Sequence, residues 1–380
     1  MNDKKKMLYL CPGDLTLPGT GTGVSAMLRL SFFAKRYDTY LVHLGGFGRS
    51  PKKVKIKATP QIPPELCGYV KIEYSDSGYF LFSWKLYSAA KRLMEKVKFD
   101  FIFADFEKAG LYAYLLSRRY NVPFVYISHN VEYQRYLDFA KRDPKRYPLI
   151  PYIYLVERLA CSKASLVATV SEEDRRVFEK WVSREELILV PGGFEEKVFH
   201  PYYDEPVGTP PIILFLGNFN TPGNKEAVYL VRERIVEKVV SKYPDAIFQF
   251  VGANPPTDVS HPNFEFTGFV EDLLPYLRRA NVVIVPVLVG AGIHIKTIEA
   301  LTCGKYVVST PKGTEGIHQK LHSLVICEID QFAQAICEIL RKKKFIYRED
   351  YQILKDEYSS DSILGRFDCR MRKAFGYSPS

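Results

Sequence analysis

Two successive series of short apolar runs constrain the fold of this chain more than any other feature. The runs are rich in β-branched and aromatic residues, and longer amphipathic stretches such as 85–97 and 107–119 separate them. Near-continuous apolar runs are typical of parallel strands covered on both faces, and alternation with helices favours a parallel sheet. The expected strands are 7–11, 39–44, 99–104, 123–128, 165–170, 212–217, 246–252, 282–287, 306–310 and 323–328. We therefore expect an α/β chain of two doubly wound, Rossmann-like domains.

The boundary between the two domains is expected in a segment dense in glycine and proline, residues 191–211. A length of 380 residues suits two domains. We place the first at 1–195 and the second at 196–359. The helical tail, residues 360–380, is expected to pack back on the first domain.

Charge and cysteine usage narrow the class of protein. The chain carries 53 Lys and Arg against 43 Asp and Glu, a net charge of +10 that attracts anionic partners without choosing among them. Its 7 cysteines stand singly with no C-x-x-C spacing, which indicates free thiols in a reducing compartment and no zinc site. No D-x-D motif follows an expected strand, so we expect neither a metal nor another cofactor. The apolar stretch near the start is too short for a secretory signal and no run could span a bilayer, so the protein is expected to be cytoplasmic.

A glycine-rich loop follows the first expected strand. Gly19, Gly21 and Gly23 precede a helix expected to begin near Val24, and the free N–H groups of a helix start can bind an anion. The spacing is not G-x-G-x-x-G, and the second strand ends without a carboxylate, which argues against a dinucleotide. On these residues alone, a flexible loop without a ligand is an equally good interpretation.

A second glycine pair carries more chemistry. Gly290 and Gly292 precede a helix expected at about 293–303, and its N-terminus would form a phosphate cradle. Lys296 and Glu299 lie three residues apart, hence on one helical face. The lysine can neutralise a diphosphate and the glutamate can accept hydrogen bonds from sugar or ribose hydroxyls. The competing interpretation is an ordinary surface Lys–Glu pair.

The segment GAGIHIKTIEALTCGKYVVST, with PKGTEGI after it, resembles the signature of retaining glycosyltransferases of the E-x7-E family, the group 1 type. Further segments resemble landmarks of that family in the same order: SHNVEYQRY, VATVSEED, LVPGGF, FLGNFNTPGNKEAV and FTGFVEDLLPYL. The resemblance implies the GT-B fold, in which two Rossmann-like domains face each other across a cleft. It also implies transfer of a sugar from a nucleotide-diphosphate sugar to a glycan or lipid-linked acceptor, with retention of configuration and without a metal.

The resemblance assigns donor contacts in the second domain. Glu299 occupies the second glutamate of the motif and would bind the ribose, whereas Ala291 replaces the first glutamate. Gly292, Ile293 and His294 would offer backbone groups to the diphosphate and the sugar.

Other donor contacts follow from the remaining landmarks. Asn218 stands where the family often has an arginine, and Lys225 falls about one place beyond the expected lysine, where it would still reach the phosphates beside Lys296. Gly268 and Phe269 belong to the segment that resembles the base-binding part.

In the first domain, Gly21 and Gly23 match a loop that touches the diphosphate, and His129 matches a histidine near the reacting sugar. His129 and Lys225 are the residues to which we assign catalytic roles. Without the resemblance, a structural loop histidine is the simpler interpretation of His129. Glu315 is either a further donor contact or a carboxylate at a helix start.

Basic segments at 52–57, 141–147 and 341–344 are interpreted first as solvated surface. Two of them lie in the first domain near aromatic residues, which would suit an anionic membrane surface and a cytoplasmic, peripheral location. The alternatives are a sugar-nucleotide epimerase or glycogen-type synthase of the same fold, a catalytically inactive glycan-binding protein, and a basic nucleic-acid-binding protein. We do not expect nucleic acid as a partner, because zinc-finger spacing, an RNP-type motif and a concentrated basic stripe are all missing from the sequence.

Overall fold

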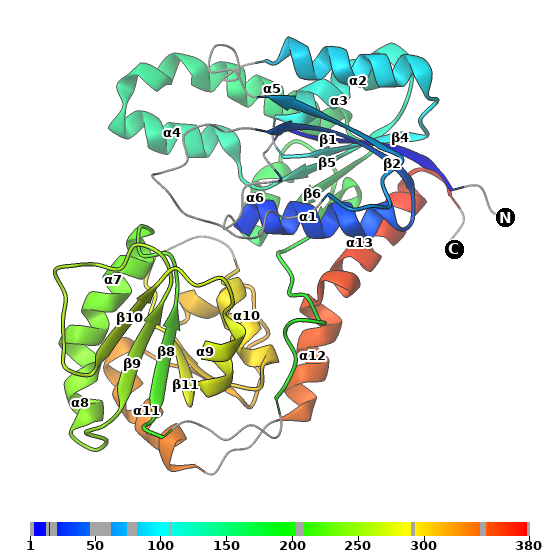
Figure 1. Ribbon diagram of the computed structural model, residues 1–380. Coiled ribbons are helices and arrows are strands. Elements are labelled where there is room, and N and C mark those ends of the chain that lie inside the picture. Colours follow the sequence, from blue (N-terminus) through cyan, green and yellow to red (C-terminus); the bar gives the residue numbers. More distant parts are fainter. Residues whose placement is uncertain are drawn as a thin grey trace. The chain divides into compact units, whose positions relative to one another are not determined.

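The computed structural model describes residues 4–12, 15, 21–45, 62–73, 82–106, 108–202, 209–289, 293–342 and 347–377. They form two compact units (Figure 1). Unit 1 comprises Met1–Pro191 with Leu364–Ser380, and unit 2 comprises Gly192–Ile363. The division falls inside the segment rich in glycine and proline, and the C-terminal residues return to unit 1.

Unit 1 is built on a fully parallel sheet with the strand order β3-β2-β1-β4-β5-β6-β7. Its strands are β1 (Lys6–Cys11), β2 (Asp38–Gly45), β3 (Gly68–Glu73), β4 (Phe101–Asp105), β5 (Phe124–Ser128), β6 (Leu166–Thr169) and β7 (Leu187–Leu189). Its helices are α1 (Gly21–Ala34), α2 (Trp84–Lys96), α3 (Ala109–Tyr120), α4 (Glu132–Arg142), η1 (Pro144–Leu149), α5 (Ile150–Lys163), α6 (Glu172–Phe178) and η2 (Arg184–Glu186).

Alternation along the central strands sends apolar side chains to both faces of this sheet. Leu8, Leu10 and Ile102 pack beneath α2 and α3, while Phe103 on the opposite face contacts Phe33 of α1 with the two rings tilted by 48°. The last helix, α13 (Ser360–Ala374), joins this second face through Phe367, which lies 5.8 Å from the Phe103 ring between centroids. The C-terminal helix therefore completes the core of unit 1.

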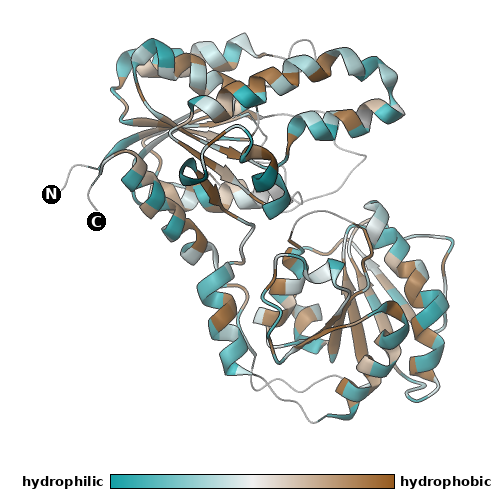
Figure 2. Ribbon diagram, turned by 180° about the vertical axis from the view of Figure 1, so that it is seen from behind, coloured by the Kyte–Doolittle hydropathy of each residue, from teal (hydrophilic) through white to brown (hydrophobic). Residues whose placement is uncertain are grey.

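Unit 2 repeats the plan with a second parallel sheet, in the order β10-β9-β8-β11-β12-β13. Its strands are β8 (Ile212–Leu216), β9 (Ile247–Val251), β10 (Phe264–Gly268), β11 (Val282–Val285), β12 (Tyr306–Ser309) and β13 (Leu324–Ile326). Its helices are α7 (Pro222–Leu230), the π-helical turn η3 (Val231–Ile235), α8 (Val236–Val240), α9 (Leu274–Arg279), α10 (Ile295–Thr302), η4 (Lys312–Thr314), η5 (Ile329–Gln331), α11 (Phe332–Arg341) and α12 (Arg348–Tyr358). The most hydrophobic ribbon of both units lies in the sheets (Figure 2).

The two doubly wound parallel sheets confirm the fold class predicted from the apolar runs. Three strands were missing from that prediction: β3, β7 and β10. All three are edge strands, and β10 shows why they escaped, because its residues are only partly buried or exposed. An edge strand lacks the continuous apolar run of a strand buried on both faces.

The carboxyl ends of β8 and β9 approach each other through two glycines. Gly252 has φ +143°, and a Cβ added to it would lie 1.9 Å from the carbonyl oxygen of Gly217. The N–H of Gly252 donates to the carbonyl of Gly268 at 3.0 Å, so the same residue also fixes the end of β10. A side chain at position 252 would separate these strands at the carboxyl edge of the sheet.

We predict that Gly252→Ala destabilises unit 2 by about 3 kcal/mol or more, since it combines a disallowed φ with a backbone clash. Urea unfolding followed by circular dichroism measures this loss. Gly365→Ala is the matched control, because Gly365 lies in α13 and a Cβ added to it would meet no atom within 4 Å; it should stabilise unit 1 by about 0.5–1 kcal/mol. Equal stabilities of the two variants would contradict this account of Gly252.

Candidate functional site

The carboxyl edge of the unit 2 sheet brings together four of the donor-site residues expected from the sequence, Asn218, His294, Lys296 and Glu299. β8 and β11 are neighbours at the point where the strand order reverses, and open α/β sheets bind ligands beyond the carboxyl ends of the strands at such a point. The segment 217–220 leaves β8 here, and α10 begins here after β11. The site therefore lies where the topology of the sheet predicts it.

Lys296 is the centre of this edge. Its Nζ donates to Oδ1 of Asn224 at 2.7 Å and lies 4.4 Å above the ring of Phe215. Burial lowers the pKa of Lys296 to about 7. The lysine thus has a neutral amide and an aromatic face around it but no anionic partner among the described residues.

Asn224, which accepts the hydrogen bond from Lys296, is itself held by Asn218. Asn224 Nδ2 donates to the carbonyl oxygen of Asn218 at 3.0 Å, and the side-chain Oδ1 of Asn218 accepts hydrogen bonds from Asn220 N and Asn254 Nδ2, both at 3.1 Å. Two glycines allow close packing here. A Cβ on Gly217 would lie 2.8 Å from Asn224 Nδ2, and a Cβ on Gly223 would lie 2.4 Å from the carbonyl oxygen of Val289. The first turn of α7 therefore packs directly against the chain that leaves β11.

Glu299 follows one turn later on the same face of α10. Burial raises the pKa of Glu299 to about 7. No hydrogen bond or ion pair links its carboxyl group to another described residue, although its charge contributes, after burial, to raising the pKa of Cys303 to about 12. A partly buried carboxyl group that has no partner among the described residues marks a candidate ligand contact.

The N-terminus of α10 completes the edge. His294 is the N-cap residue without a side-chain cap bond, and its Nε2 is buried with no hydrogen-bond partner among the described residues. Burial, with the positive charges of Lys296 and Lys312 nearby, lowers the pKa of His294 to about 4, so the ring is neutral at pH 7. Thr297 fixes the helix start, because its hydroxyl donates to the carbonyl of Gly313 at 3.0 Å.

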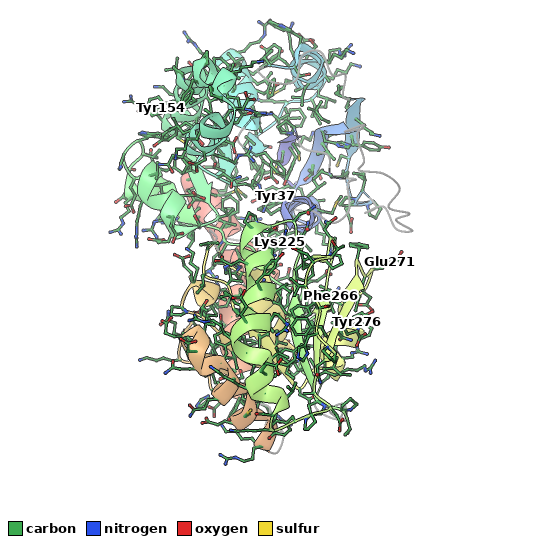
Figure 3. All side chains as sticks on the ribbon, turned by 90° about the vertical axis from the view of Figure 1, so that its left-hand side faces the viewer. Tyr37, Tyr154, Lys225, Phe266, Glu271 and Tyr276 are labelled. Carbon is green, nitrogen blue, oxygen red and sulfur yellow. The ribbon has the colours of Figure 1, made fainter. Side chains whose placement is uncertain are left out.

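The other sequence-predicted donor residues take separate places. Lys225 lies exposed on α7 with its Nζ 6.0 Å above the Tyr229 ring, and no contact joins it to Lys296 or Asn224 among the described residues (Figure 3). Gly268 ends β10 with φ +72°, and Phe269 after it is 47% exposed. Ile293 is half-buried and packs against the unit 2 core. Gly292 lies outside the described residues.

Glu315 forms an ion pair with Lys312 and follows η4 as its C-cap residue. The sequence left two interpretations of Glu315, a further donor contact or a carboxylate at a helix start. The second is wrong, since Glu315 follows the end of η4. The ion pair neutralises Lys312 beside the site.

In unit 1, His129 lies just after β5 in a buried polar cluster with Asp105, Arg29 and Tyr9. His129 Nε2 is 2.9 Å from Asp105 Oδ1, and Arg29 Nε and Nη2 donate to the two Asp105 oxygens at 3.2 and 3.0 Å. The Tyr9 hydroxyl donates to Asp105 as well. Burial opposes ionisation of Asp105, yet the Arg29 charge and the His129 hydrogen bond outweigh burial and hold its pKa well below the ordinary value.

Gly21 and Gly23 lie in the first turn of α1, which begins three residues earlier than the sequence suggests. Asn224, Asp105 and Arg29 were not predicted from the sequence as site residues. The only signal for Asp105 was its position at the end of an apolar strand, and Arg29 lay unremarked within an amphipathic helix.

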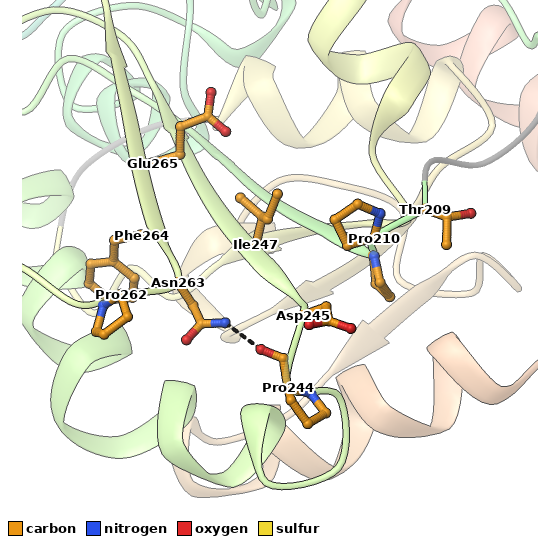
Figure 4. A pocket seen from close by; sticks show the side chains of 10 residues that line it. Thr209, Pro210, Pro244, Asp245, Ile247, Pro262, Asn263, Phe264 and Glu265 are labelled. Atoms are coloured by element: carbon orange, nitrogen blue, oxygen red, sulfur yellow. Dashed lines mark hydrogen bonds between the residues drawn. The ribbon is translucent and has the colours of Figure 1, made fainter.

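A hollow at the opposite, amino ends of β8, β9 and β10 is a second concave surface of unit 2. It is lined by Thr209, Pro210, Pro211, Pro244, Asp245, Ile247, Pro262, Asn263, Phe264 and Glu265. Asn263 closes it by donating to the carbonyl of Pro244 at 2.7 Å (Figure 4). Its charged side chains are both acidic, so it does not suit a diphosphate.

Among the described residues, no group of three His, Cys, Asp or Glu side chains is arranged to hold a metal ion. None of the helices in the described ranges has both the length and the apolar character needed to cross a bilayer.

Comparisons with known proteins agree with this geometry. Residues 21–197 match the family model Glycosyltransferase Family 4, and residues 210–342 match the model Glycosyl transferases group 1. No curated protein sequence matches the chain. The chain has the GT-B fold, and a glycosyltransferase family model matches each of its two halves. These matches support an enzyme that transfers sugar from a nucleotide sugar.

Solved structures of this fold are similar over nearly the whole chain. A sucrose-phosphate synthase from Thermosynechococcus elongatus has a TM-score of 0.67 at 18% identity, with 99% of this chain and 100% of that chain covered. HepE of Anabaena in complex with UDP has a TM-score of 0.67 at 15% identity, with coverage of 97% and 100%. A glycosyltransferase from Rickettsia africae has a TM-score of 0.67 at 13% identity, with coverage of 99% and 100%.

The shifted pKa values of Lys296 and Glu299, both partly buried on α10, predict a minimum in stability near neutral pH. Between pH 4.5 and 7 the folded chain keeps a proton on Glu299 that the unfolded chain releases, so the free energy of unfolding falls as pH rises. Between pH 7 and 10.5 the unfolded chain keeps a proton on Lys296 that the folded chain releases, so the free energy of unfolding rises again.

Thermal unfolding across pH 5–10 tests this dependence. Lys296→Met should flatten the arm above pH 7 and leave the arm below it, while Glu299→Gln should do the reverse. A stability profile that both variants leave unchanged would show that these groups are not buried as the structure has them.

Proposed function

We propose that this chain is a retaining glycosyltransferase whose unit 2 binds a nucleotide-diphosphate sugar at the carboxyl edge of its sheet. The observation that carries the proposal is the pair on α10: a partly buried lysine with no anionic partner and a partly buried carboxyl group with no partner at all, among the described residues. A diphosphate supplies the negative charge beside Lys296. Ribose hydroxyls supply donors for Glu299.

The proposed chemistry follows from charge. When the bond between the sugar C1 and the diphosphate oxygen breaks, negative charge develops on the leaving phosphate. Lys296 and the N-terminus of α10 are preorganised to stabilise that charge, since they lie where the protein has already excluded much of the water. In front-face attack, the acceptor oxygen bonds to C1 on the side from which the diphosphate leaves, and the leaving phosphate takes the acceptor proton. Retention rests on the family resemblance.

UDP is the nucleotide to test first, because the similar Anabaena HepE structures contain UDP and UDP-glucose. We assign the nucleotide sugar to unit 2 and a glycan or lipid-linked acceptor to unit 1, with His129 near the reacting sugar. Lys225 is assigned to the donor phosphates as well. To contact them, its exposed side chain must turn away from the Tyr229 ring.

We predict that one nucleotide among UDP-, GDP-, dTDP- and CMP-sugars raises the melting temperature, because a ligand at about 100 times its dissociation constant adds about 2.7 kcal/mol to stability. Calorimetry in buffers of different ionisation enthalpy should show uptake of a proton at pH 8, as the diphosphate returns Lys296 to its charged form. Glu299→Gln should weaken binding about tenfold or more, the size of lost hydrogen bonds to hydroxyls.

Glu338→Gln is the matched control, since Glu338 is exposed on α11 and, among the described residues, its side chain bonds only Gln334. Undiminished nucleotide affinity in a folded Glu299→Gln variant would refute the donor site. With a donor identified, the anomeric coupling in the product's proton NMR spectrum decides retention. Conversion of the donor without any acceptor would indicate the epimerase instead.

The proposal includes an anionic membrane surface as the place where the acceptor is met. η1 and α5 expose Tyr147, Tyr152 and Leu155, with Leu155 63% exposed. The exposed cations Lys145 and Arg158 accompany them, and Tyr152, Leu155 and Arg158 follow at helical spacing along one side of α5. Lys141 and Arg146 in the same basic segment are instead paired with Asp138 and Asp143.

We predict that the chain co-sediments with vesicles containing phosphatidylglycerol and not with pure phosphatidylcholine vesicles. Leu155→Glu should abolish sedimentation, because it places a negative charge among the inserted side chains. Gln334→Glu, an exposed change of the same charge on α11, should have no effect. Equal sedimentation of the two variants would exclude α5 as the membrane contact.

A further inference from the structure

A group of aromatic side chains in unit 1 lies where three helices begin. Phe82 and Trp84 stand at the start of α2. Tyr112 lies in the first turn of α3, and Tyr152 lies in the first turn of α5. Because α2 and α3 follow β3 and β4, and α5 precedes β6, all three helices begin at the carboxyl edge of the unit 1 sheet. Open α/β sheets bind ligands beyond the carboxyl ends of their strands, so this edge is a place to look for a ligand contact.

Contacts between the rings join these residues into one group. The Phe82 ring lies 4.9 Å from the Trp84 ring and 4.9 Å from the Tyr112 ring, between centroids. The Tyr112 hydroxyl accepts a hydrogen bond from the N–H of Ser83, the N-cap residue of α2, at 2.6 Å. Burial raises the pKa of Tyr112 to about 12 against this hydrogen bond, and the nearby Tyr152 adds to the rise. The start of α2 is therefore fixed against α3.

Trp84 is the exposed member of this group. Its exposed fraction is 72%, the largest among the large apolar side chains that the structure describes. Its ring meets Phe82 at 71° and Tyr87 at 86°, so neither neighbour stacks flat on the indole. A side chain that stays mostly in water contributes little to the core. These contacts instead restrict the orientation of a broad aromatic face at the surface.

Polar groups with unused hydrogen-bonding capacity surround this aromatic face. Tyr87 and Ser88 follow Trp84 at spacings of three and four residues, so the three side chains share one side of α2. No described residue bonds the Tyr87 hydroxyl or the exposed Lys85 ammonium group. None of the described residues accepts a hydrogen bond from the Tyr112 hydroxyl. A ligand on Trp84 would therefore find both donors and acceptors beside it.

A pyranose ring has the chemistry that matches these groups. One of its faces presents C–H bonds with partial positive charge, which the negative face of an indole attracts, and its rim carries hydroxyl groups that hydrogen-bond to polar side chains. A lipid surface fits less well. Among the residues of α2, all of which are described, Trp84 is the one exposed large apolar side chain, and the exposed Ser88 and Arg92 follow on the same side.

We propose that Trp84 is a stacking platform for a pyranose ring of the acceptor. The identity of this sugar as part of the acceptor rests on the proposed function, which assigns a glycan or lipid-linked acceptor to unit 1. The platform itself is built entirely from unit 1. Trp84 then contributes to the affinity for the acceptor and takes no part in the transfer of the sugar.

Saturation-transfer NMR on the full chain measures this contact without any activity. The probes are trisaccharides of glucose, galactose, mannose and N-acetylglucosamine. Irradiation of the aromatic protons of the protein should transfer saturation to the C–H protons of at least one trisaccharide. Trp84→Ala should weaken its binding about tenfold, the size of one aromatic contact, and Trp84→Tyr should retain part of it. Because most of Trp84 is already exposed, the alanine variant should fold.

Tyr69→Ala is the matched control. Tyr69 is a 59% exposed aromatic residue near the amino end of β3, outside the group, and its loss should leave the transfer unchanged. Equal transfer to the trisaccharide in the wild-type chain and in folded Trp84→Ala would overturn the inference, as would the absence of transfer to all four probes.

The fluorescence of Trp84 distinguishes a sugar from a membrane as its partner. The chain has two tryptophans, and Trp181→Phe leaves Trp84 as the single one. In that variant, a saturable change in emission with the trisaccharide that shows transfer supports the platform. A shift of the emission to shorter wavelength with phosphatidylglycerol vesicles, with no response to any trisaccharide, would assign Trp84 to the membrane surface and overturn the inference.

Failure of this inference is distinguishable from failure of the proposed function. Donor binding depends on Lys296 and Glu299 of unit 2, and calorimetry reads it directly. A chain that binds a nucleotide sugar but gives the same trisaccharide signal with and without Trp84 refutes only the inference. A trisaccharide signal that depends on Trp84, with no nucleotide binding, refutes only the donor site.

Discussion

The reversal of strand order in each parallel sheet is the constraint on which both candidate sites depend. In unit 1 the order reverses between β1 and β4, and in unit 2 between β8 and β11. Connections from the two neighbouring strands leave in opposite directions at such a point, so no crossover helix covers their carboxyl ends. The fold therefore leaves the ends of these strands available to side chains, and the chain places its buried charges there in both units.

The two units differ in whether these charged side chains have partners. In unit 1, Asp105 is saturated by Arg29, Tyr9 and His129, and the ionised form is favoured despite complete burial. In unit 2, Lys296 and Glu299 stand on one helical face without a charged partner among the described residues, and burial pushes both pKa values to about 7. A satisfied network gives rigidity, whereas an unsatisfied pair is stable only at some expense to folding. This difference agrees with the proposed role of the unit 2 edge as the donor-binding site.

Central strands and the lysine–glutamate pair were predictable from the sequence because each depends on local spacing. A strand buried on both faces must be apolar throughout, and residues three apart must share a helical face. The edge strands β3 and β10 contain polar residues between the apolar ones, and the edge strand β7 is only three residues long. Asn224 and Asp105 were not predictable, since their roles depend on contacts with Lys296 and His129 that are distant in sequence. The resemblance directed attention to Lys225, while in the structure the neighbouring Asn224 bonds Lys296.

Ala291 stands where the motif that the sequence resembles has its first glutamate, and it lies outside the described residues. The described residues that follow it form an edge without an anion: His294 is neutral at pH 7, and Lys296 Nζ donates to the Asn224 amide. On the proposed function, the missing negative charge comes from the diphosphate of the donor. The affinity for the donor should then depend on the protonation of Lys296, whose pKa burial lowers to about 7.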